Sequence, residues 1–154
     1  MKIFIGVIIV GISTCIGILL GLKYTERKKF FKDFTAFNNR YLSGVAFTGD
    51  SIKKILSFSA EKNSDFYECI ITFFYEKKFA LKKRYLSRDE SDFLFNYLSG
   101  LGRGDAESEK KNATFTESKL KDYVEKCEEE EKKYKPLLVK LGFLLGVVVF
   151  ILII

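Results

Sequence analysis

Two stretches without a charged side chain, one at each end of the chain, most restrict what this sequence can fold into. Ile3 to Leu22 is a run of 20 apolar or small residues, and Leu141 to Ile154 is a run of 14. At about 1.5 Å per helical residue, the first run spans about 30 Å, which is a full hydrocarbon core. The second reaches about 28 Å if residues 136–139 join it and Lys140 extends back to the interface. The sequence therefore predicts two membrane-spanning helices.

Basic residues flank the inner end of each apolar run. They are Lys23, Arg27, Lys28, Lys29 and Lys32 after the first run, and Lys132, Lys133, Lys135 and Lys140 around the start of the second. Because basic residues stay on the cytoplasmic side, we expect a cell-membrane hairpin with both termini outside. This divides the chain into a transmembrane helix over 1–22, a cytoplasmic helical domain over 23–135 and a second transmembrane helix over 136–154.

Other interpretations exist for both ends. The first run could be a cleaved signal peptide, but it is long for one and no A-x-A site follows it. A lipoprotein anchor at Cys15 would have Thr14 in an unfavourable place directly before the cysteine. The second run could be a core helix, but a middle region of 113 residues, 23–135, could not also cover residues 147–154.

Glycines recur at a spacing of four in both apolar runs. Gly17 and Gly21 form one pair, and Gly142 and Gly146 form the other. Such pairs let two helix backbones approach closely in lipid, although glycine is also simply frequent in membrane helices. We expect these four residues to lie where the two membrane helices pack.

The composition excludes several kinds of chemistry. The chain has no His, so it can hold no His-based triad or His metal site. Cys15, Cys69 and Cys127 form no C-x-x-C pair, which removes the zinc and thioredoxin-type motifs. With Lys2 and Lys140 outside it, the middle region keeps 24 of the 26 basic residues and all 20 acidic residues, a net charge of only +4. We expect no enzymatic activity, no metal or cofactor, and no nucleic-acid partner.

The fold class predicted for the whole chain is all-α, with the membrane hairpin enclosing a cytoplasmic bundle of about five helices, the last one long. Apolar side chains at spacings of three and four predict a first helix over about 24–46, an amphipathic continuation of the first apolar run: Phe30, Phe34, Phe37, Tyr41 and Val45. Thr48 to Ser51 would end it and cap a second helix over about 52–58. A third begins at Asn63-Ser64, although the run 70–74 also has strand character.

Two more helices complete the predicted bundle. Ser87 to Glu90 reads as a capping box that opens a fourth helix, which continues to about Leu101. The last runs from Ala106 to Lys135 without Gly or Pro. Its seam is weakly apolar, so we expect the later half to project into water as a stalk. The seam positions are Ala113, Thr116, Leu120, Tyr123, Cys127, Glu130 and Tyr134.

Two features of the middle region are candidates for function. The first is a basic connector, with Lys82, Lys83, Arg84 and Arg88 as candidate partner-docking residues; the alternative is an ordinary solvated surface. The second is the glycine-rich corner formed by Gly100, Gly102, Gly104 and Asp105. It lacks the G-x-G-x-x-G spacing and the P-loop lysine, so it reads as a structural turn with Asp105 as N-cap rather than an anion site.

Three segments together resemble one known family. They are the anchor followed by Tyr24-Thr25-Glu26-Arg27, the stretch from Phe93 to Glu107 ahead of a long charged helix, and Leu141-Gly142-Phe143-Leu144-Leu145-Gly146 before the hydrophobic end. This combination resembles stage III sporulation protein AB. The resemblance covers both ends and the second half of the chain.

The resemblance implies a component of the channel that sporulating cells build between mother cell and forespore. Family members are expected to sit in the mother-cell membrane with other channel proteins, to be similar to the platform F proteins of type II secretion systems, and to bind a cytoplasmic secretion-type ATPase. The leading hypothesis is therefore a membrane platform that docks an ATPase. The alternative is a small membrane-anchored sensor that binds a lipid or other ligand between its aromatic faces.

Overall fold

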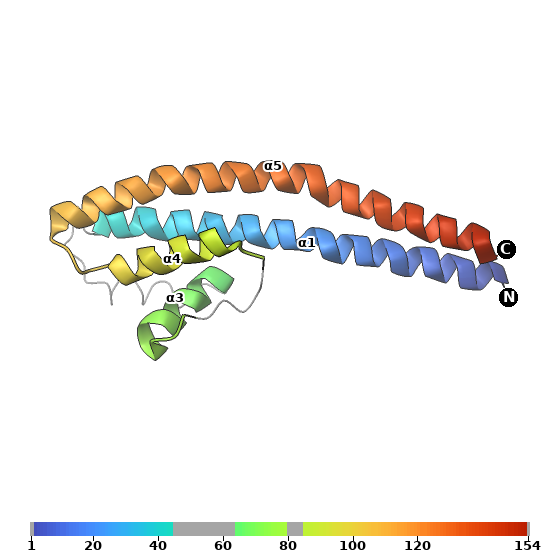
Figure 1. The fold of residues 1–154 in the computed structure, drawn as a ribbon, viewed down its shortest axis with the longest axis horizontal. Helices are drawn as coiled ribbons and strands as arrows, with labels where there is room; N and C mark the ends of the chain where they lie inside the picture. Colours follow the sequence, from blue (N-terminus) through green and yellow to red (C-terminus); the bar gives the residue numbers. More distant parts are fainter. Residues whose placement is uncertain (1, 45–63, 80–84, 154) are drawn as a thin grey trace. The chain divides into compact units, whose positions relative to one another are not determined.

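The computed structural model describes residues 2–44, 64–79 and 85–153. In these three ranges the chain forms four α-helices and no strand (Figure 1). The helices are α1 (Lys2–Ser43), α3 (Asp65–Glu76), α4 (Arg88–Gly100) and α5 (Ala106–Ile153). The all-α prediction is confirmed. The predicted break at Thr48 to Ser51 and the predicted helix over about 52–58 lie outside the described residues.

The chain divides into two compact units, which we describe separately. The hairpin unit comprises residues 1–28 and 126–154, and the helical unit comprises residues 29–125. The long helices α1 and α5 contribute residues to both units. The hairpin unit thus includes short polar stretches, 23–28 and 126–135, beyond the two apolar runs.

In the hairpin unit, the start of α1 and the end of α5 lie side by side and antiparallel (Figure 1). Gly6 faces Phe150, Gly17 faces Leu138 and Gly21 faces Lys135. The large apolar side chains point outward instead, and only 11% of the apolar window of each helix is buried. A core helix of a soluble protein would be mostly buried, so this arrangement favours two helices that face lipid.

Both long helices continue without a break past the ends of the apolar runs. No Gly or Pro lies between Leu22 and Ser43, so nothing in α1 stops the helix where its composition turns polar. Helix α5 also passes through Pro136, which lies inside it. The predicted helix over 24–46 is therefore the continuation of the first apolar helix, as its position directly after that run suggested.

The core of the helical unit is built mainly from aromatic rings. Phe30, Phe34 and Phe37 of α1 are all buried, as their spacing predicts, and Val45 of the same predicted face lies outside the described residues. Phe66 of α3 stacks on Phe34, with ring centroids 4.9 Å apart. Buried Leu94, Leu98, Ala113 and Leu120 close the core from α4 and α5. Such stacked and edge-on pairs add directional contacts to the burial of large apolar surfaces.

The ends of the shorter helices follow local sequence signals. Ser64 is the N-cap of α3, and Lys77, with φ of 55°, ends that helix in the left-handed region. Residues 70–74 are helical, so their strand character is not expressed. At α4, Ser87 Oγ accepts a hydrogen bond from the Glu90 N–H at 3.3 Å, while the Glu90 carboxylate accepts one from the Ser87 N–H at 2.8 Å. The capping box predicted at Ser87 is confirmed.

The expectation that the later half of residues 106–135 forms a stalk in water is wrong. Leu120 and Cys127 are 0% and 1% exposed. Within the helical unit, Tyr123 stacks on Phe31, and within the hairpin unit, Tyr134 stacks on Tyr24. The seam is packed because α1 runs alongside it and supplies aromatic and charged partners that the sequence of α5 alone does not show.

Candidate functional site

The four basic residues proposed for partner docking are only partly described by the structure. Arg88 is the first residue of α4 and is exposed. Lys82, Lys83 and Arg84 lie outside the described residues. The proposal that they form a docking surface with Arg88 therefore stays a prediction from the sequence.

An acidic run of α5, Glu128 to Glu131, is the other charged block of the sequence, and two of its residues form ion pairs in the hairpin unit. Glu130 forms an ion pair with Arg27, and Glu131 forms one with Lys28. Thr25 Oγ1 donates a hydrogen bond to Glu131 at 2.6 Å, and Lys135 Nζ donates to Thr25 at 3.0 Å. We call Thr25, Arg27, Lys28, Glu130, Glu131 and Lys135 the polar clasp. It ties α1 to α5 directly beyond the apolar runs.

The clasp changes the acidity of its central carboxylate. Hydrogen bonds from Lys28 and then Thr25 lower the pKa of Glu131 from its ordinary 4.5 to about 2. The charged form is thus stabilised by the fold, and the side chain of Glu131 is only 13% exposed. A carboxylate held in this way has little capacity left for an outside partner.

The glycines predicted to pack the membrane helices lie between α1 and α5. A Cβ on Gly17 would lie 2.5 Å from the carbonyl oxygen of Leu138, and one on Gly142 would lie 2.7 Å from that of Ser13. Gly21 and Gly146 face Lys135 and Val10 in the same way. Ser13 Oγ donates a hydrogen bond of 2.6 Å to the Gly142 carbonyl, which such a close approach makes possible. These small residues let the two backbones nearly touch.

The glycine-rich corner joins α4 to α5. Gly102 has φ of 71°, a backbone conformation that favours glycine. The Gly104 N–H donates to Glu109 Oε1 at 2.9 Å. Hydrogen bonds from the side chain and then the backbone N–H of Ser108 lower the pKa of Asp105. The same hydrogen bonds make the Asp105 carboxylate a cap at the start of α5. Gly100 is the last residue of α4 and has open space around it.

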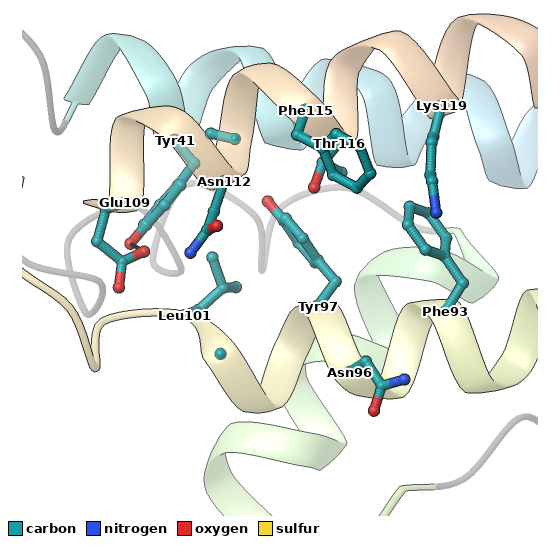
Figure 2. A pocket seen from close by; sticks show the side chains of 12 residues that line it. Tyr41, Phe93, Asn96, Tyr97, Leu101, Glu109, Asn112, Phe115, Thr116 and Lys119 are labelled. Carbon is teal, nitrogen blue, oxygen red and sulfur yellow. Dashed lines mark hydrogen bonds between the residues drawn. The ribbon is translucent and has the colours of Figure 1, made fainter. Parts of the chain in front are cut away.

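A groove of about 370 Å³ lies next to this corner, between α4 and α5 of the helical unit (Figure 2). Figure 2 shows Tyr41 and Glu109 at one end, Tyr97 in the middle, and Phe93 with Lys119 at the other end. Its size is at the lower end of the range for small-molecule sites. Local sequence patterns do not predict this groove.

The end of the groove at Glu109 is a buried polar network. The Tyr41 hydroxyl donates to Glu109 Oε2 at 2.7 Å, and Glu109 is 6% exposed. Burial, and then the hydrogen bond to Glu109, raises the pKa of Tyr41, so this phenol stays neutral. Burial likewise raises the pKa of Tyr97 well above its ordinary value. Glu109 therefore supplies the formal negative charge of this end.

A sequence signal for Glu109 existed. The seam of α5 includes Ala113, Thr116 and Leu120, and the same spacing carried one turn back reaches residue 109. This places a carboxylate on the buried face of the helix. Its importance was hidden because Tyr41, its hydrogen-bond partner, lies 68 residues away in the chain.

The opposite end of the groove carries a cation on aromatic rings. Lys119 Nζ lies 5.5 Å from the ring centre of Phe93 and 4.9 Å from that of Phe115. Phe115 is 61% exposed, so this end forms part of an open rim. Cation–π contacts of this kind hold the amine over the rings. The groove is thus electrically polar, with the carboxylate and the amine at opposite ends.

The described ranges offer no obvious place for a metal. Across residues 2–44, 64–79 and 85–153, no group of three or more His, Cys, Asp or Glu could hold one. The groove is lined by one carboxylate, one amine, two phenols, the side-chain amides of Asn96 and Asn112, and the Thr116 hydroxyl. This arrangement is suited to binding a ligand.

Comparison with known protein families gives a match over the second part of the chain. Residues 59–154 match the profile of the family described as stage III sporulation protein AB, and this range covers well over half of the 154 residues. No curated protein and no solved structure shows significant similarity to the chain.

Proposed function

The chain belongs to the stage III sporulation protein AB family and is a sporulation-related membrane protein, and from this we propose that it is a non-enzymatic platform that docks a cytoplasmic secretion-type ATPase. The platform would form part of the channel between mother cell and forespore. Its other partners would be membrane lipid and the remaining membrane proteins of that channel.

The observation that carries this proposal is the division of the chain into two units of different chemistry. The hairpin unit exposes apolar side chains over both of its long helices. The helical unit has its own buried aromatic core and a charged exterior. A lipid-facing anchor joined to a separately packed polar unit is what a membrane platform with a soluble partner requires.

We place the ATPase contact on the basic connector for two reasons. Most large apolar side chains of the helical unit are buried or half-buried. A partner protein would therefore mainly contact exposed charged side chains. The competing acidic block is engaged at Glu130 and Glu131 in the polar clasp. Basic residues on a partner-facing surface raise the association rate with an acidic partner through a field that salt screens.

The test is a pull-down of the secretion-type ATPase encoded in the same operon by the full chain in detergent micelles. Reversing Lys83 and Arg84 to Glu should weaken binding about tenfold at low salt and make the residual binding less sensitive to salt. The thermal unfolding temperature should stay near that of the wild type, because charges that face solvent and a partner, as this proposal requires, contribute little to stability.

The matched control reverses Lys110 and Lys111, two exposed residues of α5, to Glu. It changes the net charge by the same amount, so normal binding by this variant would show that position matters rather than total charge. Equal loss of ATPase binding in both double variants would contradict a specific contact at the basic connector, because it would show that only the net charge matters. Normal binding by the Lys83 and Arg84 reversal, with loss on reversing Glu129, would place the contact on the acidic face.

A ligand-responsive sensor is the second candidate, and the groove at Glu109 favours it. An electrically polar groove of about 370 Å³ with aromatic walls is not required for a purely structural platform. If the chain fails to bind the ATPase under all salt conditions but binds a small ligand in this groove, the sensor function replaces the platform.

A further inference from the structure

Glu109 is a buried carboxylate for which the described part of the chain supplies no ion-pair partner. Glu109 is 6% exposed, and its partners within the described residues are the Tyr41 hydroxyl and the Gly104 N–H. Neither carries a formal positive charge. A buried charge is unfavourable unless it is paired, so two neutral hydrogen bonds leave room for a cation at this point.

The hydrogen-bond directions at this end are fixed by the chemistry of the partners. Because a carboxylate and a backbone carbonyl only accept, the Tyr41 hydroxyl must donate to Glu109, and the Asn38 amide nitrogen must donate to the Ala113 carbonyl at 2.9 Å. The Asn38 oxygen therefore faces Tyr97, whose hydroxyl donates to it at 3.1 Å. The phenolic hydrogens of Tyr41 and Tyr97 are both used inside the fold.

What these groups still offer to the groove is acceptor capacity. Each Glu109 oxygen accepts one hydrogen bond from the fold and has a further lone pair, and the Tyr97 oxygen keeps acceptor capacity as well. An anion would be repelled by the Glu109 carboxylate, and the donor that Figure 2 shows beside it is the neutral side-chain amide of Asn112. A flat cation with several N–H groups would satisfy both carboxylate oxygens at once.

The walls and the far end of the groove also favour a flat cationic ligand. The aromatic side chains of Tyr41 and Tyr97 border the acceptor end, and ring faces attract a delocalised cation. The Lys119 amine at the other end would repel a cation there (Figure 2). A cationic ligand would therefore be oriented with its charge towards Glu109.

We propose that the groove between α4 and α5 binds a guanidinium group, held by a two-point hydrogen bond to the Glu109 carboxylate between the rings of Tyr41 and Tyr97. The group could belong to a free small molecule or to an arginine side chain of a protein. This inference does not depend on the docking of an ATPase.

The test uses the full chain in detergent micelles with one fluorescent reporter. The chain has no Trp, so Phe115→Trp at the exposed rim adds a single indole next to the groove. Butylguanidinium and butylurea are matched probes, since the urea has nearly the same shape without the charge. We expect a saturable fluorescence change with butylguanidinium and a response at least tenfold weaker with butylurea.

Two variants identify the carboxylate that is responsible. Glu109→Gln, in the reporter background, should weaken butylguanidinium binding at least tenfold, because the amide keeps the shape but loses the charge. Glu107→Gln removes an exposed carboxylate from the same helix and should leave binding unchanged. If Glu109→Gln does not fold, the readout becomes the NMR amide signal of Gly104 in the wild type. That signal should shift on titration, because this amide donates to Glu109.

A second pair of probes separates the two sources. A capped Ala-Arg-Ala peptide is compared with its citrulline counterpart, which again replaces guanidinium by urea. Binding of the arginine peptide at least as tightly as butylguanidinium assigns the site to a protein side chain, and exclusion of the peptide assigns it to a free molecule. Equal responses to both members of a pair, unchanged binding by Glu109→Gln, or an unmoved Gly104 signal would overturn the proposal.

Discussion

Two glycines of the corner, Gly100 and Gly102, are close in sequence and have different structural requirements. Gly102 has φ of 71°, where any other L-residue is strained. Gly100 ends α4, and a Cβ built on it would meet nothing within 4 Å. The glycine pattern alone does not separate them, because only the backbone conformation shows which one the turn requires.

This difference gives a matched pair of variants. Gly102→Ala should destabilise the full chain by about 1 kcal/mol, because alanine disfavours the left-handed region. Gly100→Ala should be neutral or slightly stabilising, since alanine is the better helix former. Thermal unfolding in detergent followed by circular dichroism measures both. Equal unfolding temperatures would show that the turn can be remade with ordinary backbone angles.

At the scale of the element, the hairpin unit depends on backbone contact between α1 and α5. Its large apolar side chains point away from the helix pair, so little apolar side-chain packing holds the two helices together. The contact is made by small residues and by Ser13, whose hydroxyl bonds to the Gly142 carbonyl. In lipid, this kind of close packing replaces the hydrophobic effect as the source of association.

Adding one methyl group should therefore separate contact glycines from exposed ones. Gly17→Ala should destabilise the helix pair by about 1–3 kcal/mol, because the new Cβ would lie 2.5 Å from the Leu138 carbonyl oxygen. Gly11→Ala in the same helix should have no such effect, since nothing lies within 4 Å of its Cβ position. Unfolding of both variants in the same detergent is compared. A loss of stability in Gly11→Ala as large as in Gly17→Ala would contradict a contact-specific role.

The polar clasp makes the stability of the full chain sensitive to acid. The pKa of Glu131 falls from 4.5 to about 2 on folding, so the unfolded state binds a proton first. Its contribution is fully present above about pH 4.5 and is lost as the pH falls towards 2. The unfolding temperature should therefore fall between about pH 5 and pH 2.

The variant Glu131→Gln should be less stable at neutral pH and should lose part of that acid sensitivity. Glu129→Gln is the control, because Glu129 is exposed on the same helix. Thermal unfolding across the pH range measures all three proteins. A Glu131→Gln profile parallel to the wild type would mean that another carboxylate governs the acid response.

At the scale of the whole molecule, we expect the hairpin unit to lie in the membrane and the helical unit to lie in the cytoplasm. The basic residues that flank the apolar runs predict both termini outside. Two of these residues, Arg27 and Lys28, also form the ion pairs of the polar clasp, so the same charges help to hold α1 against α5. Orientation is a property of the chain in the membrane and needs its own measurement.

Cysteine labelling in intact cells provides it. With Cys15, Cys69 and Cys127 replaced by Ala, a cysteine added directly after Ile154 should react with a membrane-impermeant maleimide. Glu129→Cys, in the predicted cytoplasmic region, should react only after the membrane is made permeable. The opposite pattern would invert the topology, and it would place the helical unit on the side away from any cytoplasmic ATPase.

Sequence periodicity by itself determined the helices and the identity of most core residues. Phe30, Phe34 and Phe37 are buried because their spacing puts them on one face, and Ser87 caps α4 through a contact three residues away. Two apolar runs long enough to span a bilayer also required no tertiary information. All these features depend on residues that are near one another in the chain.

Only the tertiary structure decided which polar residues meet. Tyr41 bonds to Glu109, and Arg27 pairs with Glu130 across 103 positions of the chain. The sequence made the seam of α5 look weakly apolar and therefore solvated, because the aromatic partners of Tyr123 and Tyr134 come from α1. The groove could not be predicted for the same reason, because its charged groups and its walls come from three helices, α1, α4 and α5. Long-range pairing depends on how the helices pack, and local periodicity carries no information about it.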